Sequence, residues 1–212
     1  ILFYYNAFLM LSNGLEAKVG TLGSKYEFFH EWKRLKESDA GSVELETMLR
    51  GICEKKTFLD LLENFILYDH SGGHTTKILA RNHQYLGVNE AVSAYENRKL
   101  KDGRLGVFWH TQGSGKSYSM VFLAQKIRRK FAGSPTIVVL TDRDELNRQI
   151  SDTFENCGLL GKTKASQFIA SSGTDLVKKL QGNPSFVFTL IQKFNLPKEP
   201  PIYPDHDILI LS

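Results

Sequence analysis

A glycine-rich segment between a strand pattern and a helix pattern constrains the fold of this chain most. Residues 105–109 are apolar enough to predict a strand, and residues 116–131 have the periodicity of a helix. The sequence that joins them, from His110 to Ser117, reads HTQGSGKS and matches G-x-x-x-x-G-K-[ST] at every required position except the first. A strand, a glycine-rich turn and a helix in this order predict a loop that binds phosphate groups.

The residue types in this loop suit phosphate chemistry. Gly113 and Gly115 let the backbone turn so that its N–H groups converge on a phosphate at the positive end of the following helix. Lys116 is expected between the β- and γ-phosphates of a nucleotide, and the Ser117 hydroxyl is expected to ligate Mg²⁺. These two residues are the predicted catalytic pair. The predicted cofactor-binding residues within the loop are Thr111, Gln112, Gly113, Ser114, Gly115, Lys116 and Ser117.

A second phosphate-binding pattern, G-x-G-x-x-G, is not met, because Tyr118 occupies its third glycine position. This argues against a dinucleotide-dependent oxidoreductase. Two other function classes stay open on the residues alone. One is a P-loop kinase or another small-molecule NTPase, and the other is a module that holds a nucleotide for structural reasons only.

The remainder of the chain after residue 76 alternates between helix and strand patterns. Strands are predicted at 136–140, 185–190 and 208–211, and helices at 78–97, 116–131 and 144–155. The strands are almost wholly apolar, which is typical of parallel strands buried on both faces. The sequence therefore predicts an α/β fold in which helices cover both faces of a parallel sheet.

The first 75 residues have a different pattern. The apolar run 1–11 predicts a buried strand, ended by the turn Ser12-Asn13-Gly14. Residues 35–42 read as a linker, with Ser42 as the expected N-cap of a helix at 43–54. A second helix is predicted at 57–67, before the chain breaks at 69–73.

Composition excludes several classes of protein. The chain of 212 residues has no apolar stretch of the roughly 18 residues that a membrane span needs. Cys53 and Cys157 lie far apart, with no Cys or His at metal-ligand spacing, so neither a disulfide scaffold nor a zinc site is indicated, and a reducing cytoplasm is expected. The net charge is +4, and residues 75–150, with 13 basic and 6 acidic groups, carry +7. This excess favours a polyanionic partner such as a nucleotide or nucleic acid.

Taken in order, these stretches resemble one family, the motor (R, or restriction) subunit of type I restriction-modification enzymes, which is a superfamily 2 helicase-like translocase. The sequence WHTQGSGKS at 109–117 is similar to that family's Walker A loop, which accounts for the missing first glycine. ARNHQY at 80–85 resembles the segment with its adenine-reading glutamine, here Gln84. Residues 138–150 resemble motif Ia, residues 188–194 resemble the Ib region, and residues 2–8, 13–14 and 29–33 resemble the end of its nuclease domain.

The resemblance implies a cytoplasmic enzyme that uses ATP and Mg²⁺ to pull double-stranded DNA and cut it, together with methyltransferase (M) and specificity (S) subunits. It implies a nuclease remnant at 1–35, a helical linker at 36–75 and the first RecA-like motor lobe at 76–212. By position, the DNA path would be lined by Arg143, Thr189, Gln192 and Lys193. On the residues alone, Thr141 or Asp142 could equally serve as a plain cap for the helix at 144–155.

The chain begins at Ile1 and ends at Ser212 within an apolar run, so we expect it to be part of a longer protein. The family's Walker B acidic motif, its second lobe with an arginine finger and its nuclease carboxylates would then lie outside these residues. The 212-residue chain alone is expected to bind nucleotide weakly and to hydrolyse almost none.

Overall fold

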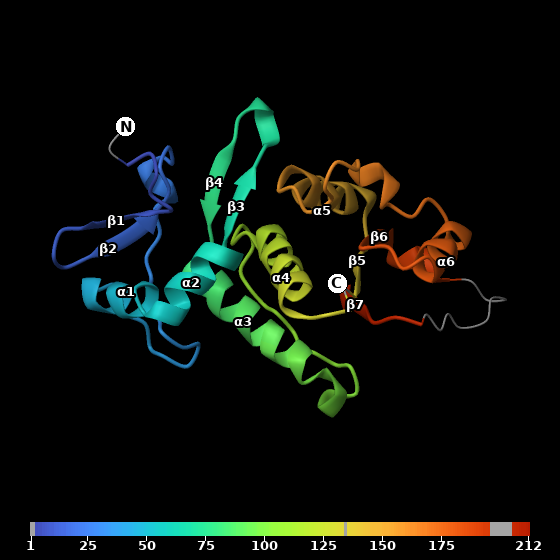
Figure 1. Ribbon diagram of the computed structural model, residues 1–212, viewed down its shortest axis with the longest axis horizontal. Helices are drawn as coiled ribbons and strands as arrows, with labels where there is room; N and C mark the ends of the chain where they lie inside the picture. Colours follow the sequence, from blue (N-terminus) through green and yellow to red (C-terminus); the bar gives the residue numbers. More distant parts are fainter. Residues whose placement is uncertain (1–2, 134, 196–204) are drawn as a thin grey trace. The chain divides into compact units, whose positions relative to one another are not determined.

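The computed structural model describes residues 3–133, 135–195 and 205–212, which form two compact units, residues 1–123 and 124–212 (Figure 1). Helix α4 (Lys116–Lys130) begins in the first unit and ends in the second. The expected domains, a nuclease remnant at 1–35, a linker at 36–75 and a motor lobe at 76–212, are defined by function and stay a prediction. No helix in the described ranges combines the length and the apolarity that crossing a membrane requires.

Two antiparallel hairpins belong to the first unit. Strand β1 (Leu9–Ser12) pairs with β2 (Ala17–Gly20), and β3 (Ile66–Asp69) pairs with β4 (Thr76–Leu79). The turn after β1 is confirmed, since Asn13 Oδ1 accepts N–H groups from the two residues that follow Gly14. The predicted strand at 1–11 is wrong for residues 3–8, where the chain bends before Leu9, and residues 1–2 lie outside the described ranges.

The helices of the first unit are α1 (Leu45–Ile52), α2 (Lys55–Asn64), α3 (Asn82–Glu96) and the first part of α4. Both predicted linker helices are present, but the prediction is wrong at residues 66 and 67, which belong to β3. Glu44 and not Ser42 stands at the start of α1. The prediction that helix 78–97 begins at residue 78 is wrong. Residues 76–79 pair as β4, and Arg81 has extended backbone, so α3 begins only at Asn82.

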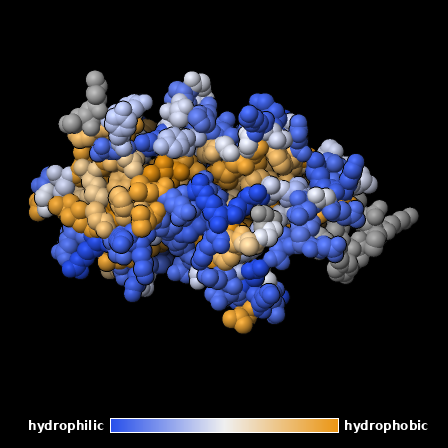
Figure 2. Space-filling model, in the orientation of Figure 1, coloured by the Kyte–Doolittle hydropathy of each residue, from blue (hydrophilic) through white to orange (hydrophobic). Residues whose placement is uncertain are grey.

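Four aromatic rings form the core of the first unit. Trp32 lies 5.4 Å from Tyr85, Phe65 lies 4.8 Å from Tyr85, and Phe65 lies 5.6 Å from Phe122, measured between ring centroids. Trp32, Phe65 and Phe122 are fully buried. The segment before α1, strand β3, and helices α3 and α4 therefore share one core. By contrast, apolar side chains are exposed over the β1–β2 hairpin (Figure 2).

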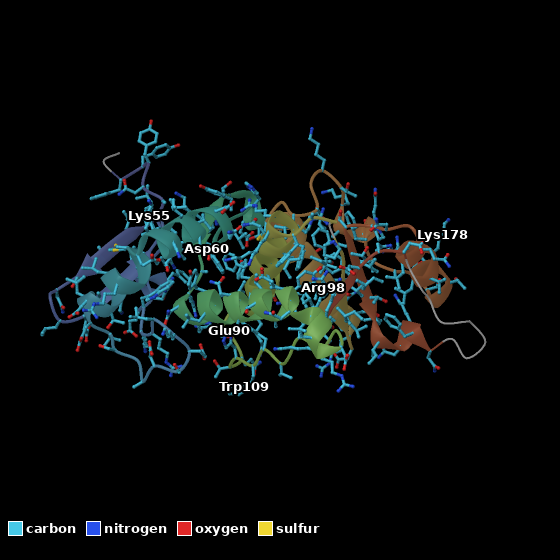
Figure 3. The ribbon with its side chains drawn as sticks, turned by 60° about the horizontal axis from the view of Figure 1, so that its bottom comes forward. Lys55, Asp60, Glu90, Arg98, Trp109 and Lys178 are labelled. Carbon is cyan, nitrogen blue, oxygen red and sulfur yellow. The ribbon has the colours of Figure 1, made fainter. Side chains whose placement is uncertain are left out.

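The predicted strand at 105–109 is wrong, since these residues pair with no strand in the described part of the chain. Gly106 has φ +129°, which interrupts the extended backbone, and Val107 and Trp109 are 94% and 78% exposed. Figure 3 shows Trp109 at the surface, away from the helices. Phe108 packs over Gly87 of α3, where an added Cβ would lie 2.1 Å from its ring, and Leu105 is half-buried.

A three-stranded parallel sheet forms the centre of the second unit. Strand β5 (Thr136–Thr141) lies between β6 (Phe186–Leu190) and β7 (Ile208–Leu211), with Val138 opposite Val187 on one side and Ile210 on the other. All three strands were expected from their apolar runs. The α/β class and the parallel sheet are thus confirmed.

Helices cover both faces of this sheet. Phe154 of α5 (Asp144–Asn156) lies 5.5 Å from Phe186 and 5.3 Å from Phe188. Because side chains alternate along a strand, Val187 points to the opposite face. There it packs with Val138 and with Leu176 and Leu180 of α6 (Gly173–Gln181). Helix α6 was not predicted, although the Ser172 hydroxyl caps it by accepting the N–H of Asp175.

Candidate nucleotide-binding site

The glycine-rich loop turns directly into the N-terminus of α4. Gly113 and Gly115 have φ +77° and +86°, values that side chains with a Cβ rarely adopt. Between them, the Ser114 N–H donates to the Thr111 carbonyl at 3.3 Å, which closes the turn. Because the first N–H groups of a helix point out of its N-terminus, this end of α4 suits an anion such as phosphate.

The side chains that follow Gly115 supply the charge and the hydroxyl that phosphate chemistry needs. Lys116 Nζ donates to the His110 carbonyl at 2.8 Å, so its ammonium group lies over the loop itself. Thr111, Gln112 and Lys116 are exposed, whereas Ser117 is half-buried at the start of the helix. The predicted loop residues are therefore brought together, and they fit a nucleotide phosphate with its metal ion.

Gln84 of α3 hydrogen-bonds to the glycine-rich loop. Its amide is buried, and its Oε1 accepts the N–H of Arg81 at 2.9 Å. Its Nε2 donates to the Gly115 carbonyl at 2.9 Å and to the Ser119 hydroxyl at 3.3 Å. An added Cβ on Gly115 would lie 2.9 Å from this nitrogen, so the glycine is needed for space as well as for its backbone angle. In this structure the amide faces the loop.

His83 contacts the loop from the same helix turn. Its Nε2 lies 3.2 Å from the Ser114 carbonyl, which can only accept, so the ring donates. The His83 and His110 rings meet edge to face at 4.5 Å, and Phe108 meets His110 at 4.4 Å. Burial lowers the pKa of both imidazoles below the ordinary value, which favours their neutral forms.

The β3–β4 hairpin holds the first turn of α4 from another direction. The Tyr118 hydroxyl donates to Asp69 Oδ2 at 2.5 Å, and the Ser71 N–H donates to Oδ1 at 2.8 Å. Burial alone would raise the pKa of Asp69, but these hydrogen bonds lower it below the ordinary value. A charged carboxylate therefore anchors the residue that directly follows Ser117.

The four residues expected to line a DNA path lie near the ends of β5 and β6. The exposed Arg143 pairs with Asp142 at 3.3 Å, and Gln192 Nε2 donates to the Asp142 carbonyl at 3.1 Å. Lys193 donates to the Ala170 carbonyl, and Thr189 is fully buried in β6. The structure thus places only Arg143 and Gln192 together at the surface. Neither Thr141 nor Asp142 caps α5. The N-cap residue is Arg143, and its side chain makes no hydrogen bond to the first turn of the helix.

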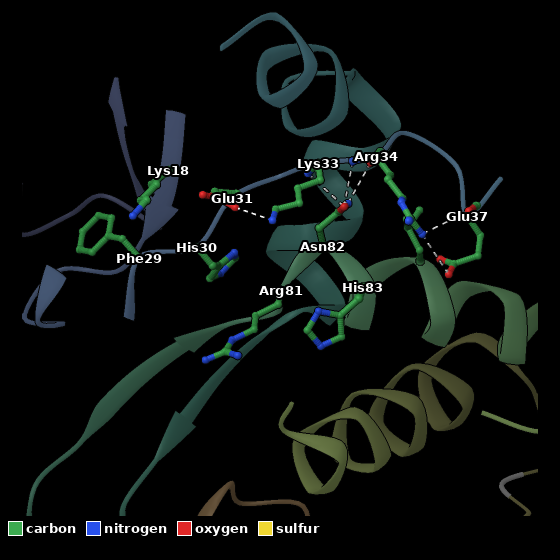
Figure 4. Close-up of a pocket in the computed structure, with 11 residues that line it drawn as sticks. Lys18, Phe29, His30, Glu31, Lys33, Arg34, Glu37, Arg81, Asn82 and His83 are labelled. Atoms are coloured by element: carbon green, nitrogen blue, oxygen red, sulfur yellow. Dashed lines mark hydrogen bonds and ion pairs between the residues drawn. The ribbon is translucent and has the colours of Figure 1, made fainter. Parts of the chain in front are cut away.

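A cavity of about 450 Å³ lies beside the loop and was not predicted (Figure 4). Its walls come from Lys18 of β2, the segment 29–37 and the start of α3. Asn82 fixes the last two together, since its Oδ1 accepts the N–H groups of Lys33 and Arg34 and its Nδ2 donates to the Arg34 carbonyl. The signal that could have found it is the run Arg81-Asn82-His83, three polar residues directly before Gln84.

His30 is the most perturbed side chain in this cavity. Burial, then the charge of Arg81 and the neighbouring His83, lower its pKa from 6.5 to about 4. The backbone of Leu79 and Glu31 near the ring offsets this lowering only in part, since neither ring nitrogen has a well-aligned hydrogen bond among the described residues. His30 is therefore neutral at pH 7 and cannot gain a proton without loss of stability.

This pKa predicts an acid-labile fold. The unfolded chain protonates the ring below pH 6.5, whereas the folded ring stays neutral down to about pH 4, so stability falls as the pH falls through this window. Between about pH 7 and pH 5, the unmodified chain should lose about 2 kcal/mol more of its free energy of unfolding than the His30→Gln variant loses. Urea unfolding at both pH values measures it. His70→Gln, which alters an exposed ring, serves as the control and should match the unmodified chain. Equal losses in all three proteins would contradict the prediction.

Comparison with known proteins places the loop in a family. Residues 83–212 match the model of the SWI2/SNF2 ATPase family. The chain is 37% identical to the type I restriction enzyme HindI endonuclease subunit of Haemophilus influenzae, over all of the chain and 21% of that relative. It is 30% identical to a Methanocaldococcus jannaschii protein whose name assigns it provisionally as the type I restriction enzyme MjaIXP endonuclease subunit, over 96% of the chain and 21% of that protein.

The chain thus spans about a fifth of the length of these relatives, and in the first of them the alignment includes the residues that precede the ATPase match. The matched region contains Gln84, the glycine-rich loop, α4 and the parallel sheet described above. A phosphate-binding loop before a helix, followed by a parallel sheet with helices on both faces, is the arrangement expected of such an ATPase. The chain therefore belongs to the SWI2/SNF2 ATPase family.

Proposed function

We propose that this chain is part of the restriction subunit of a type I restriction-modification enzyme, and that its glycine-rich loop binds ATP and Mg²⁺ to drive movement along double-stranded DNA. The observation that carries the proposal is the loop geometry. Two glycines with positive φ turn the backbone into the N-terminus of α4. Gln84 and His83 of α3 hydrogen-bond to carbonyl groups of the loop. The relatives are named as endonuclease subunits of type I restriction enzymes, one of them provisionally, which does not favour a small-molecule kinase or a purely structural module.

Each loop residue has a distinct task in this proposal. The N–H groups of Gly113 and of residues 115–117 would bind the β-phosphate, while the Ser114 N–H keeps its bond to the Thr111 carbonyl. Lys116 would exchange its bond to the His110 carbonyl for phosphate oxygens. The Ser117 hydroxyl would hold Mg²⁺, which neutralises developing charge on the phosphates. Thr111, Gln112 and Ser114 would complete the loop. Gln84 would contact adenine, in exchange for its bonds to Gly115 and Ser119.

The rest of the proposed activity involves other parts of the protein and other subunits. In the full-length protein, residues 1–35 would end the nuclease domain and residues 36–75 would link it to the motor. Arg143 and Gln192 would contact DNA phosphates, with Thr189 and Lys193 supporting the same edge. Methyltransferase and specificity subunits would supply DNA recognition. Because the substrate would be DNA within the cell, the enzyme would act in the cytoplasm.

The test is ATP hydrolysis by the full-length protein, assembled with its M and S partners, with and without double-stranded DNA. Duplex DNA that contains the recognition site should raise turnover by about tenfold or more, equivalent to about 1.4 kcal/mol of barrier. Arg143→Ala should weaken this stimulation while basal hydrolysis stays unchanged, with the exposed Arg50→Ala on α1 as the matched control. A rate of ATP hydrolysis that is the same with and without duplex DNA would contradict the proposed motor function.

A further inference from the structure

We propose that Asp69 and Tyr118 are positioning residues of the nucleotide site, because the hydrogen bond between them fixes the first turn of α4 so that the Ser117 hydroxyl meets the Mg²⁺ of a bound nucleotide. This inference rests on the proposed function and extends the site to the β3–β4 hairpin, which lies outside the glycine-rich motif. Neither residue contacts phosphate or metal in this arrangement. Both act through Ser117.

The first turn of α4 needs support from outside the helix. Helix ends fray, because their terminal backbone groups have no partner within the helix. Lys116 bonds only to the loop itself, at the His110 carbonyl, and no hydrogen bond to the Ser117 hydroxyl occurs in the part of the chain that the structure describes. A hydroxyl that ligates a metal ion works best when its direction is fixed before the ion binds. Neighbouring residues therefore have to hold this turn.

The Asp69–Tyr118 pair supplies this support from the hairpin. Asp69, the last residue of β3, is 6% exposed, and its Oδ2 accepts the Tyr118 hydroxyl at 2.5 Å. Its Oδ1 accepts the N–H of Ser71 at 2.8 Å, so the carboxylate cannot turn away without losing both bonds, and bonds to a charged carboxylate are strong. The Tyr118 ring also lies near Gly115, where an added Cβ would be 3.9 Å from its Cδ2. The hairpin is thus tied to the residues on either side of the predicted catalytic pair.

A second contact holds the same turn, but the proposed nucleotide would release it. The buried Ser119 hydroxyl accepts the Gln84 amide at 3.3 Å. In the proposed function, Gln84 exchanges this bond for a contact with adenine. The bond between Tyr118 and Asp69 uses no group that the nucleotide would take over. It can therefore keep the turn in place while Ser117 holds the metal ion.

The experiment compares ADP binding with and without Mg²⁺, so that no hydrolysis is needed. The full-length protein is titrated with ADP in Mg²⁺ and with ADP in EDTA, and the ratio of the two affinities is the Mg²⁺ gain. Tyr118→Phe removes only a hydroxyl, and it should lower the Mg²⁺ gain about fivefold or more while affinity in EDTA changes by less than about twofold. Ser117→Ala should lower the gain at least as much. The matched control is Tyr68→Phe, which removes a hydroxyl from an exposed ring of β3 and should leave both affinities unchanged.

A double variant separates positioning from a general structural role. If Tyr118 acts through Ser117, Tyr118→Phe combined with Ser117→Ala should lose no more of the Mg²⁺ gain than Ser117→Ala alone. Losses that multiply would overturn the inference, because the tyrosine would then act independently of the serine. A Tyr118→Phe protein that is less stable but keeps its Mg²⁺ gain would overturn it too. Asp69→Asn, which keeps an acceptor but removes the charge, should show a smaller loss in the same direction, and it serves as the second variant.

The outcomes distinguish this inference from the function on which it rests. If Lys116→Ala leaves ADP binding unchanged in both buffers, the proposed nucleotide site itself fails. If Lys116→Ala weakens ADP binding but Ser117→Ala keeps the Mg²⁺ gain, the metal role of Ser117 fails, and the positioning role fails with it. If both variants behave as expected, the site stands. A Mg²⁺ gain in Tyr118→Phe equal to that in Tyr68→Phe would then overturn the positioning role alone.

Discussion

Lys116→Ala is expected to lower kcat/KM for ATP hydrolysis by the full-length protein about 1,000-fold. The alanine removes the ammonium group that would stabilise charge on the β- and γ-phosphates in the transition state. The folded structure should tolerate the change, because the side chain is exposed and makes one hydrogen bond, to the His110 carbonyl. Steady-state hydrolysis, followed by release of inorganic phosphate, measures the effect.

The matched control is Lys130→Ala at the opposite end of the same helix. Lys130 is exposed near Phe131, so its loss removes the same charge from α4 far along the chain from the glycine-rich loop. We expect hydrolysis by this variant to stay within about twofold of the unmodified protein. If Lys116→Ala retained hydrolysis at the level of Lys130→Ala, the chemistry would occur at another site and the loop would not be catalytic.

Gly51→Ala is expected to destabilise the first unit by about 3 kcal/mol. Alanine favours a helix over glycine by about 1 kcal/mol, so propensity alone predicts the opposite sign. The steric effect decides, because an added Cβ would lie 2.2 Å from Trp32 Nε1 and 2.4 Å from its Cδ1. The Trp32 ring is buried in the aromatic core beside Tyr85 and cannot swing into solvent. Either the ring or α1 must therefore move.

Urea unfolding monitored by tryptophan fluorescence tests this expectation. The two tryptophans, Trp32 and Trp109, both belong to the first unit, so the signal reports on the unit that contains Gly51. Gly182→Ala is the control, since its added Cβ would meet only backbone oxygens at an ordinary 3.5 Å. Its effect should be within about 0.5 kcal/mol. An unfolding midpoint for Gly51→Ala at or above that of the unmodified chain would show that α1 adjusts without cost.

The parallel sheet and the loop were predictable because their signals are local. Strands β5, β6 and β7 are short apolar runs, and no charged residue interrupts them. The loop is specified by Gly113 and Gly115, whose positive φ values need no distant partner. Such features depend on a few neighbouring residues, so a single sequence is enough to identify them.

The features that were missed depend on contacts between distant residues. Residues 105–109 have the composition of a strand, but a strand needs a neighbour to pair with, and Val107 remains exposed. The β3–β4 hairpin is only four residues long on each side, too short for alternation to stand out from the flanking helix patterns. The cavity depends on Asn82 reaching back to Lys33 and Arg34, and the burial of His30 depends on how these distant segments pack.

The bonds from Asn82 to the backbone of Arg34 have a consequence for chain entropy. They join residues 48 positions apart. The chain between Arg34 and Asn82, which contains α1, α2 and the β3–β4 hairpin, is therefore a long loop whose two ends are held together by the amide side chain of Asn82. The entropy of closing such a loop grows only with the logarithm of its length, and doubling the length costs about 0.6 kcal/mol. Natural insertions between residues 35 and 81 would therefore leave the closure almost unchanged. Loss of this amide would remove the closure at the base, and the segment would then be held by its side-chain packing, with Phe65 against Tyr85 and Phe122.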